Sequence, residues 1–219
     1  MKPGEPGHDP AAVRAMRLKE LEKSAELLGI RHVELLGYAD SGMDGWDANH
    51  AADSFTNADV DEAAGRLAKL MELYRPQVVV TYDENGGYGH PDHIQAHRIT
   101  VAATEKTGIP EKLYYTAVPQ SGLQMMFDHL KASGLAEQLG MEEPMNFGVS
   151  DDVITTTVDV ARYADAKVRA LQAHASQTDS IFLLQLPAEA RPLVFGSESF
   201  IRVRGDGPDK EDDLFAGLR

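Results

Sequence analysis

Apolar side chains recur along the first part of the chain at helical spacing. Over residues 10–29 they return every three or four positions opposite a charged face, and a glycine closes the run, which predicts a helix. A second helix is predicted after Asp59, because Asp59 and Glu62 three residues on are start signals and Pro76 is a stop signal. Between these two helices, residues 40–59 are too polar and glycine-rich to predict a regular element.

Short runs of β-branched and apolar residues alternate with the helices. Residues 31–38 form one run, which we expect near a sheet edge, and "QVVVTY" at 77–82 is typical of a strand buried on both faces. A helix from about Pro91 to Lys106 and a strand at 112–118 follow. This alternation predicts an α/β fold with a Rossmann-like, mostly parallel sheet covered by helices.

The second half of the chain is less regular. We expect a broken helix, a β-rich segment, an amphipathic helix and a late strand, at residues 121–141, 154–160, 161–177 and 199–204. The acidic residues at 209–213 are expected to be solvated. The chain is therefore interpreted as one domain over 1–219, with an α/β core at 1–118 and a smaller, irregular C-terminal part at 119–219.

Composition narrows the classes of partner and cofactor. The net charge of −14 argues against nucleic acid or an anionic membrane as a partner. Because the chain has no cysteine, any metal must be held by His, Asp, Glu or water. There is no run of ~18 apolar residues, and the first ten residues lack the apolar region of a secretory signal. Cytoplasm is the expected location.

The segment "TYDENGGYGHPDHIQAHR" at 81–98 concentrates the chemistry. It follows a predicted strand, and in open α/β sheets ligands bind beyond the carboxyl ends of strands. Pro91 suits the first turn of a helix, which places His90 at the cap and His93 one turn in, on the same face. Neutral imidazole suits Zn²⁺ and several other transition metals.

Other side chains of this segment have matching chemistry. Asp92 is suited to orient a histidine through its free ring N–H, and Tyr88 to donate a hydrogen bond to a developing oxyanion. His97 lies four residues after His93, so a His93/His97 ligand pair is an alternative. A helix start with solvated histidines is the plainer interpretation, but this combination behind a strand and a glycine loop favours a functional site.

At these residues the sequence resembles the PIG-L/LmbE-like family of zinc-dependent N-acetylglucosaminide deacetylases. "NGGYGHPDH" is similar to the family's second metal motif. The resemblance covers most of the chain and extends to "RLKELEKSAELLGI", "DSGM", "AKVRALQAHASQ" and, loosely, "DDLFAGL". The most similar branch is the mycothiol-pathway group, which contains N-acetylglucosaminyl-inositol deacetylases and mycothiol S-conjugate amidases.

The resemblance implies an LmbE-like fold, metal-assisted hydrolysis of an N-acyl amide, and a role for each matched residue. The cofactor it implies is Zn²⁺, with Fe²⁺ as an alternative. The implied roles are metal ligand for His93, oxyanion stabilisation for His90 with help from a mobile Tyr88, orientation of the histidine pair for Asp92, and sugar binding for Arg17 and Asp40.

The family's first motif, of the type "HPDD", has no counterpart in the chain. The single "HPD" lies at 90–92, and "GHDP" at 7–10 has the two residues in reverse order. We therefore expect a chain truncated at its N-terminus, or a degenerate relative, with an unpaired strand edge. Since catalytic zinc usually has three protein ligands, Asp83, Glu84 or His97 would have to substitute.

Three functions remain open at this point. The first is deacetylation of an N-acetylglucosaminyl-inositol. The second is cleavage of a mycothiol S-conjugate, and the third is a non-catalytic fragment or relative that binds sugar or metal. Trp46 is a candidate to stack on a sugar, although a lone tryptophan more often packs, and His174 and Gln177 are interpreted mainly as hydrogen-bonding residues of the fold.

Overall fold

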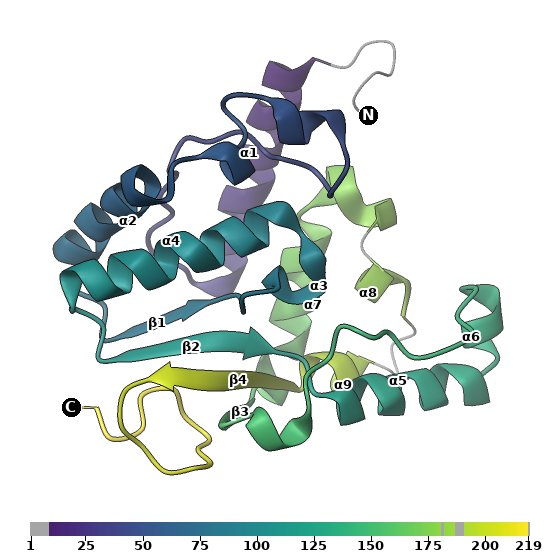
Figure 1. The fold of residues 1–219 in the computed structure, drawn as a ribbon. Coiled ribbons are helices and arrows are strands. Elements are labelled where there is room, and N and C mark those ends of the chain that lie inside the picture. The colour runs from purple at the N-terminus through teal and green to yellow at the C-terminus, as the bar shows by residue number, and fades with distance from the viewer. Residues whose placement is uncertain (1–8, 181, 187–190, 219) are drawn as a thin grey trace. The chain divides into compact units, whose positions relative to one another are not determined.

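The computed structural model describes residues 9–180, 182–186 and 191–218 (Figure 1). The helices are α1 (Pro10–Leu28), α2 (Val60–Tyr74), α3 (Gly86–Gly89), α4 (Pro91–Thr107), α5 (Gln120–Ala132), α6 (Leu135–Gln138), α7 (Ala164–Gln172), α8 (Phe182–Gln185) and α9 (Arg191–Phe195). The strands are β1 (Val78–Thr81), β2 (Lys112–Ala117), β3 (Thr156–Asp159) and β4 (Ser197–Arg204). Short 3₁₀ helices lie at Asp47–His50, Phe55–Asn57, Asp151–Val153, Ala161–Tyr163 and Ala175–Ser180.

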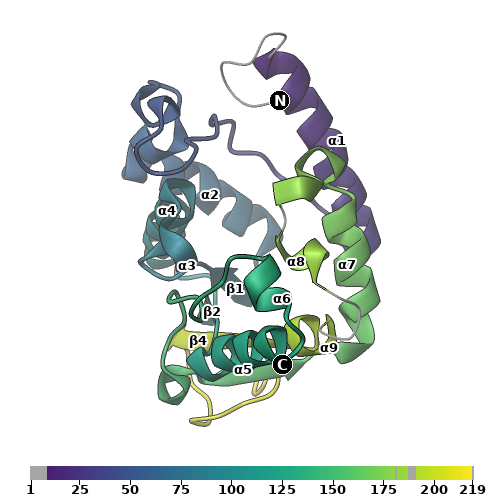
Figure 2. The same cartoon turned by 90° about the vertical axis from the view of Figure 1, so that its right-hand side faces the viewer.

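The described residues form two compact units. The helical unit combines the chain up to Glu34 with Val160–Gly196, and the sheet unit combines Leu35–Asp159 with the chain from Ser197 onward. In the helical unit, α1 and α7 lie side by side (Figure 2). None of the described helices has both the length and the apolar character needed to cross a bilayer.

The sheet has the strand order β1-β2-β4-β3. β1 and β2 are parallel, whereas β4 is antiparallel to both β2 and β3. The α/β class is thus confirmed. The predicted mostly parallel arrangement is not, because among the described strands only β1 and β2 are parallel. The late strand β4 enters between β2 and β3 in the antiparallel sense, which makes the sheet mixed.

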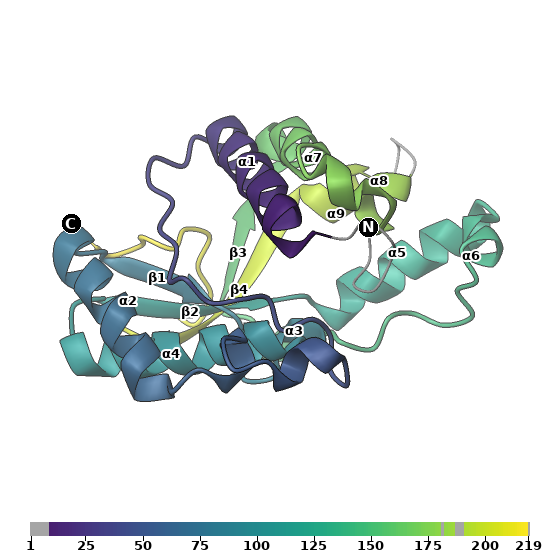
Figure 3. The same cartoon turned by 90° about the horizontal axis from the view of Figure 1, so that it is seen from above.

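Helices α2 and α4 run side by side along the β1–β2 end of the sheet (Figures 1 and 3). Their contact is a cluster of small and apolar side chains, Ala63, Ala64, Ala68, Met71, Ile99 and Ala103, with Val79 of β1 packed against it. The helix starts agree with the sequence signals. Asp59 accepts a hydrogen bond from the Glu62 N–H at the start of α2, and Pro91 opens α4.

Two strand predictions need correction. Residues 31–38 form no strand, because none of the described segments pairs with them; the nearest pairing is a single bridge from Ala39 to Ser54. β1 was expected to be buried on both faces, but it is the edge strand of the described sheet, and Val80 is 40% exposed. The expected unpaired strand edge is therefore present at β1.

The second half of the chain is close to the prediction, with one difference. The helix predicted over 161–177 is divided into α7 and flanking 3₁₀ turns. In the first half, the loop predicted at 40–59 contains two 3₁₀ turns. The broken helix is confirmed, because α5 ends before Gly134, whose positive φ of 74° separates it from α6.

Glu211 corrects the prediction that residues 209–213 are solvated. Its side chain is 1% exposed and forms ion pairs with Lys112 of β2 (3.0 Å) and Arg202 of β4 (2.8 Å). The hydroxyls of Tyr114 and Thr156 donate to the same carboxylate over 2.6 and 3.0 Å. Burial alone would raise the pKa of Glu211, but these hydrogen bonds lower it to about 2. The acid therefore joins three strands of the sheet.

Candidate functional site

The loop between β1 and α4 is folded tightly against the first turn of the helix. Asp83 accepts hydrogen bonds from the N–H groups of Gly86 and Gly87 through its carbonyl and carboxylate oxygens, respectively. Gly86 has a φ of +64°, and a Cβ atom there would lie 2.9 Å from the Cβ atom of His93 and 2.8 Å from the main-chain nitrogen of Ile94. A glycine is required at this position because the loop passes against the histidine-bearing turn.

The two motif histidines face each other, as their spacing predicts. His90 is the N-cap residue of α4, and its ring stacks on that of His93 with centroids 4.8 Å apart and an angle of 26°. The ring of Tyr82, the residue that follows β1, also stacks on His93 at 3.9 Å and 4°. Three aromatic rings from the strand end and the helix start therefore form one half-buried cluster.

The hydrogen bonds of the two imidazoles assign them opposite tautomers. Nδ1 of His90 accepts from the main-chain N–H of Asp92 (3.1 Å), so in the neutral ring the proton is on Nε2. Nδ1 of His93 contacts the carbonyl oxygen of Gly86 (3.2 Å), which can only accept, so its proton is on Nδ1 and Nε2 has a free lone pair. One ring thus offers a donor and the other an acceptor.

Burial keeps His93 in this neutral form. It lowers the pKa of His93 below its ordinary value, and the nearby His90 acts in the same direction, while Gly86 and Asp92 act against it. A neutral imidazole with a free Nε2 is the form that can bind a cation or accept a proton.

Tyr88 lies at the edge of the histidine pair. Its ring meets those of His93 and His90 edge-on, at 5.2 and 6.1 Å, and its side chain is 55% exposed. The glycines on either side both have positive φ angles. The phenol is therefore close to both imidazoles, and the residues on either side of it have backbone conformations that favour glycine.

Asp92 contacts His90 through its main chain and not through its carboxylate. The Oδ2 atom accepts a hydrogen bond from the Ser41 N–H (3.1 Å), while Oδ1 is buried and has no hydrogen-bond partner among the described residues. Asp40, next to Ser41, accepts from the Gly42 N–H (2.7 Å). The motif "DSGM" thus lies beside the histidine motif in the sheet unit.

Two of the candidate substitutes for further metal ligands, His97 and Asp83, make contacts around the loop between β1 and α4. Nδ1 of His97 contacts the carbonyl oxygen of Tyr82 (3.0 Å), and its ring packs against Tyr115 with centroids 4.9 Å apart. Asp83 holds the loop glycines. Among the described residues, no three His, Asp or Glu side chains gather as a metal site. The donors present therefore do not fit a catalytic zinc centre, which usually has three protein ligands.

Arg17 is on the exposed face of α1, in the helical unit. Desolvation raises the pKa of Glu20, but two hydrogen bonds that Glu20 accepts from Ser176, each 2.7 Å long, lower it below its ordinary value. The charge of Arg17 acts in the same direction as these hydrogen bonds. His174 and Gln177 belong to the same unit. The sugar-binding role of Arg17 stays a prediction.

Sequence reasoning missed two residues of the site. Ser41 was within a quoted motif, but its main-chain contact to Asp92 spans 51 positions. Tyr82 ended a predicted strand, and the signal for its role was its place directly before the glycine loop.

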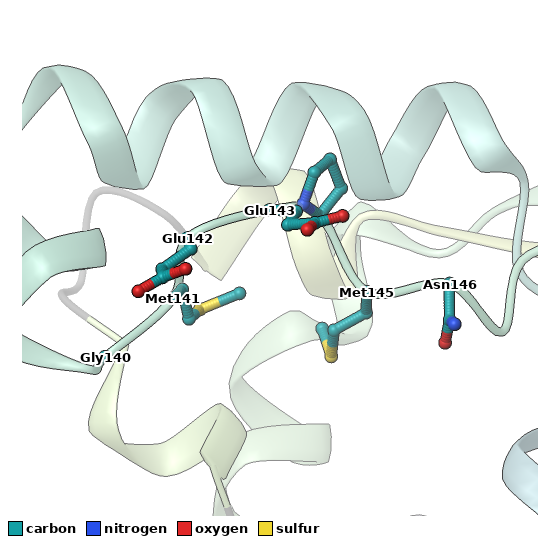
Figure 4. A pocket seen from close by; sticks show the side chains of 7 residues that line it. Gly140, Met141, Glu142, Glu143, Met145 and Asn146 are labelled. Carbon is teal, nitrogen blue, oxygen red and sulfur yellow. The ribbon is translucent and has the colours of Figure 1, made fainter.

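A pocket of about 460 Å³ lies apart from this cluster, along residues 140–146 after α6 (Figure 4). Its lining includes the side chains of Glu142, Glu143 and Asn146 and two methionines, and no histidine.

The fold is of the α/β class, and the comparisons with known proteins identify the family as one of deacetylases. The family model for PIG-L, GlcNAc-PI de-N-acetylase, matches residues 1–104. Together with the relatives described next, this match shows that the chain belongs to the PIG-L family.

Two of its most similar relatives come from Acidothermus cellulolyticus and Salinispora arenicola, and both are named 1D-myo-inositol 2-acetamido-2-deoxy-alpha-D-glucopyranoside deacetylase. The first is 44% identical, over 92% of this chain and 74% of the relative. The second is 41% identical, over 92% and 71%. A solved deacetylase of the teicoplanin pathway has the same fold, with a TM-score of 0.53 at 19% identity over 93% of this chain and 84% of that one.

Proposed function

We propose that this chain hydrolyses the acetamide of an N-acetylglucosaminyl-inositol. Its relatives are named as deacetylases of such a compound. The observation that carries the proposal is the stacked pair of His90 and His93, one presenting an N–H and the other a lone pair. Amide hydrolysis needs both functions, because an oxyanion must be stabilised and a proton or cation must be held nearby. We also infer that both units belong to one family domain, since the relatives align over 92% of the chain.

Each site residue has a proposed part in that reaction. The Nε2–H of His90 donates to the oxyanion that forms when water attacks the acetyl carbonyl, and the exposed hydroxyl of Tyr88 is the second donor. Asp92 orients His90 through its main-chain N–H. Asp40 and Arg17 are proposed to bind hydroxyl groups of the sugar.

The proposed metal is Zn²⁺, with Fe²⁺ as the alternative, and His93 is its proposed ligand through Nε2. The described residues supply too few donors for such a centre. For that reason, the roles given to His90, Tyr88 and Asp92 are derived without a metal.

The test measures the release of primary amine from N-acetylglucosaminyl-inositol, with Zn²⁺ or with Fe²⁺ under anaerobic conditions. We expect His90→Ala to lower kcat by roughly 10²–10³, the usual cost of losing one oxyanion donor. His129→Ala, the same change on α5 away from the site, should leave kcat unchanged.

A mycothiol S-conjugate assayed in parallel separates the remaining functions. Preferential release from the acetylated sugar supports the proposal, and preferential cleavage of the conjugate would replace it with the amidase function. If neither substrate yields an amine with either metal, the chain is a non-catalytic relative.

A further inference from the structure

Ser41 is fully buried, and its main-chain and side-chain polar atoms take part in long-range contacts. Its N–H donates to the Asp92 carboxylate (3.1 Å), and its hydroxyl oxygen accepts from the Ser54 hydroxyl (2.7 Å) and the Thr56 N–H (2.9 Å). Its carbonyl oxygen accepts from the side-chain amide of Asn49 (2.5 Å). One small residue therefore connects the start of α4 to three points of the loop that follows Ala39.

These contacts close the loop on itself. Ala39 pairs with Asp53 and Phe55 through main-chain hydrogen bonds of 2.9 Å each, and the side-chain amide of Asn57 donates to the carbonyl oxygens of Asn49 (2.6 Å) and Ala51 (2.9 Å). The segment 39–57 is thus a closed loop with the Ser41 hydroxyl inside it, and we refer to it as the Ser41 loop.

The Ser41 loop presents two groups suited to a sugar. Asp40 accepts from the Gly42 N–H, which fixes its carboxylate at the loop surface. Trp46 is 52% exposed and packs over Gly42, where a Cβ atom would lie 2.7 Å from its ring. A carboxylate can accept hydrogen bonds from sugar hydroxyls, and an exposed indole offers a flat apolar face to a sugar ring.

We propose that Ser41 is a positioning residue, which holds the Asp40 loop in register with Asp92 and, through Asp92, with the imidazole of His90. The proposal rests on the proposed function and adds to it a physical link between sugar binding and the histidine pair. Asp92 forms the link because its carboxylate bonds to Ser41 and its N–H bonds to His90.

The test compares Ser41→Ala with Ser133→Ala. Both changes remove a hydrogen-bonded hydroxyl, but that of Ser133 bonds only to carbonyl oxygens at the end of α5. For Ser41→Ala we expect KM to rise about tenfold while kcat changes less than about threefold, because an unpaired Ser54 hydroxyl and Thr56 N–H release the loop and with it the sugar-binding groups. Ser133→Ala should alter neither constant.

Trp46 gives a readout that does not depend on turnover, because it is the only tryptophan of the chain. Ser41→Ala should make its fluorescence more accessible to acrylamide and shift the ring-nitrogen NMR signals of His90, whereas Ser133→Ala should do neither. Should Ser41→Ala fold poorly, Ser54→Ala, which removes one of the two bonds to the Ser41 hydroxyl, should produce the same changes at smaller size.

Unchanged Trp46 quenching and unchanged His90 signals in both loop variants would overturn the link, even with a fully active parent chain. An equal loss of kcat and kcat/KM in Ser41→Ala would also overturn it, since that pattern indicates a transition-state contact. Conversely, a parent chain that releases no amine, combined with the expected Trp46 and His90 changes, leaves the link standing and refutes the proposed function alone.

Discussion

A single main-chain group sets the tautomer of each of the two imidazoles. The Asp92 N–H bonds to Nδ1 of His90, and the Gly86 carbonyl bonds to Nδ1 of His93, so two histidines three residues apart present opposite functions. Neither contact involves a charged partner for the ring. The donor and the acceptor are therefore built into the backbone of the loop and the helix start, and they are present before any substrate binds.

Long-range ¹H–¹⁵N NMR at neutral pH will test this assignment directly. We expect His90 to be protonated at Nε2 and His93 at Nδ1, because of the main-chain groups that each Nδ1 faces. His97, whose Nδ1 also faces a carbonyl oxygen, is an internal reference for the second pattern. Identical tautomers at His90 and His93 would remove the basis of the proposed function.

Gly86 is the residue whose substitution should disturb the site most directly. Gly86→Ala places a methyl group against His93 and Ile94 in addition to the strain of a positive φ. Gly108→Ala, at the other end of α4, has the same positive φ but open space around it. We expect Gly86→Ala to lower the free energy of unfolding by about 1–3 kcal/mol more than Gly108→Ala, measured by urea denaturation. Equal losses would mean that the loop moves aside without cost.

At the scale of secondary-structure elements, the C-terminal segment holds the sheet together. Glu211 forms ion pairs with side chains of β2 and β4 and accepts a hydrogen bond from Thr156 of β3. A main-chain bridge between Thr156 and Glu211 adds to this contact. β2 pairs with β1, and β1 leads into the loop and helix start that carry the histidines. The cluster therefore stabilises the scaffold of the site without belonging to it.

Glu211→Gln should cost about 3–5 kcal/mol of stability, because it leaves Lys112 and Arg202 buried without a countercharge. Asp212→Asn, an exposed neighbour, should cost almost nothing. Urea denaturation at neutral pH measures both changes, and a loss below 1 kcal/mol in Glu211→Gln would show that water reaches the cluster.

The same cluster predicts how stability depends on pH. The pKa of Glu211 is about 2 in the folded chain and is ordinarily 4.5, so its contribution is complete above pH 4.5 and is lost as the pH falls toward 2. The parent chain should therefore lose stability over that window more steeply than Glu211→Gln does. Parallel curves would contradict the assignment.

At the scale of the whole molecule, the described residues form two compact units. The sheet unit contains His90, His93, Tyr88 and Asp40, whereas Arg17 belongs to the helical unit. Each unit is assembled from segments of both halves of the chain.

The sequence by itself determined the elements whose signals are local. Asp59, Pro91 and Gly29 mark helix ends through signals within a few residues, and the helical spacing of apolar residues over 10–29 predicted α1. The spacing of His90 and His93 likewise placed both rings on one face of α4, since three residues are nearly one helical turn.

Only the tertiary structure decided the features that depend on distant segments. The run at 31–38 has the composition of a strand, but none of the described segments pairs with it. Glu211 lies among charged residues in the sequence, yet its side chain is buried in the structure. The contact of Ser41 with Asp92 is of the same kind. Pairing and burial are properties of two segments at once, so a pattern read along one segment predicts its shape but not its partner.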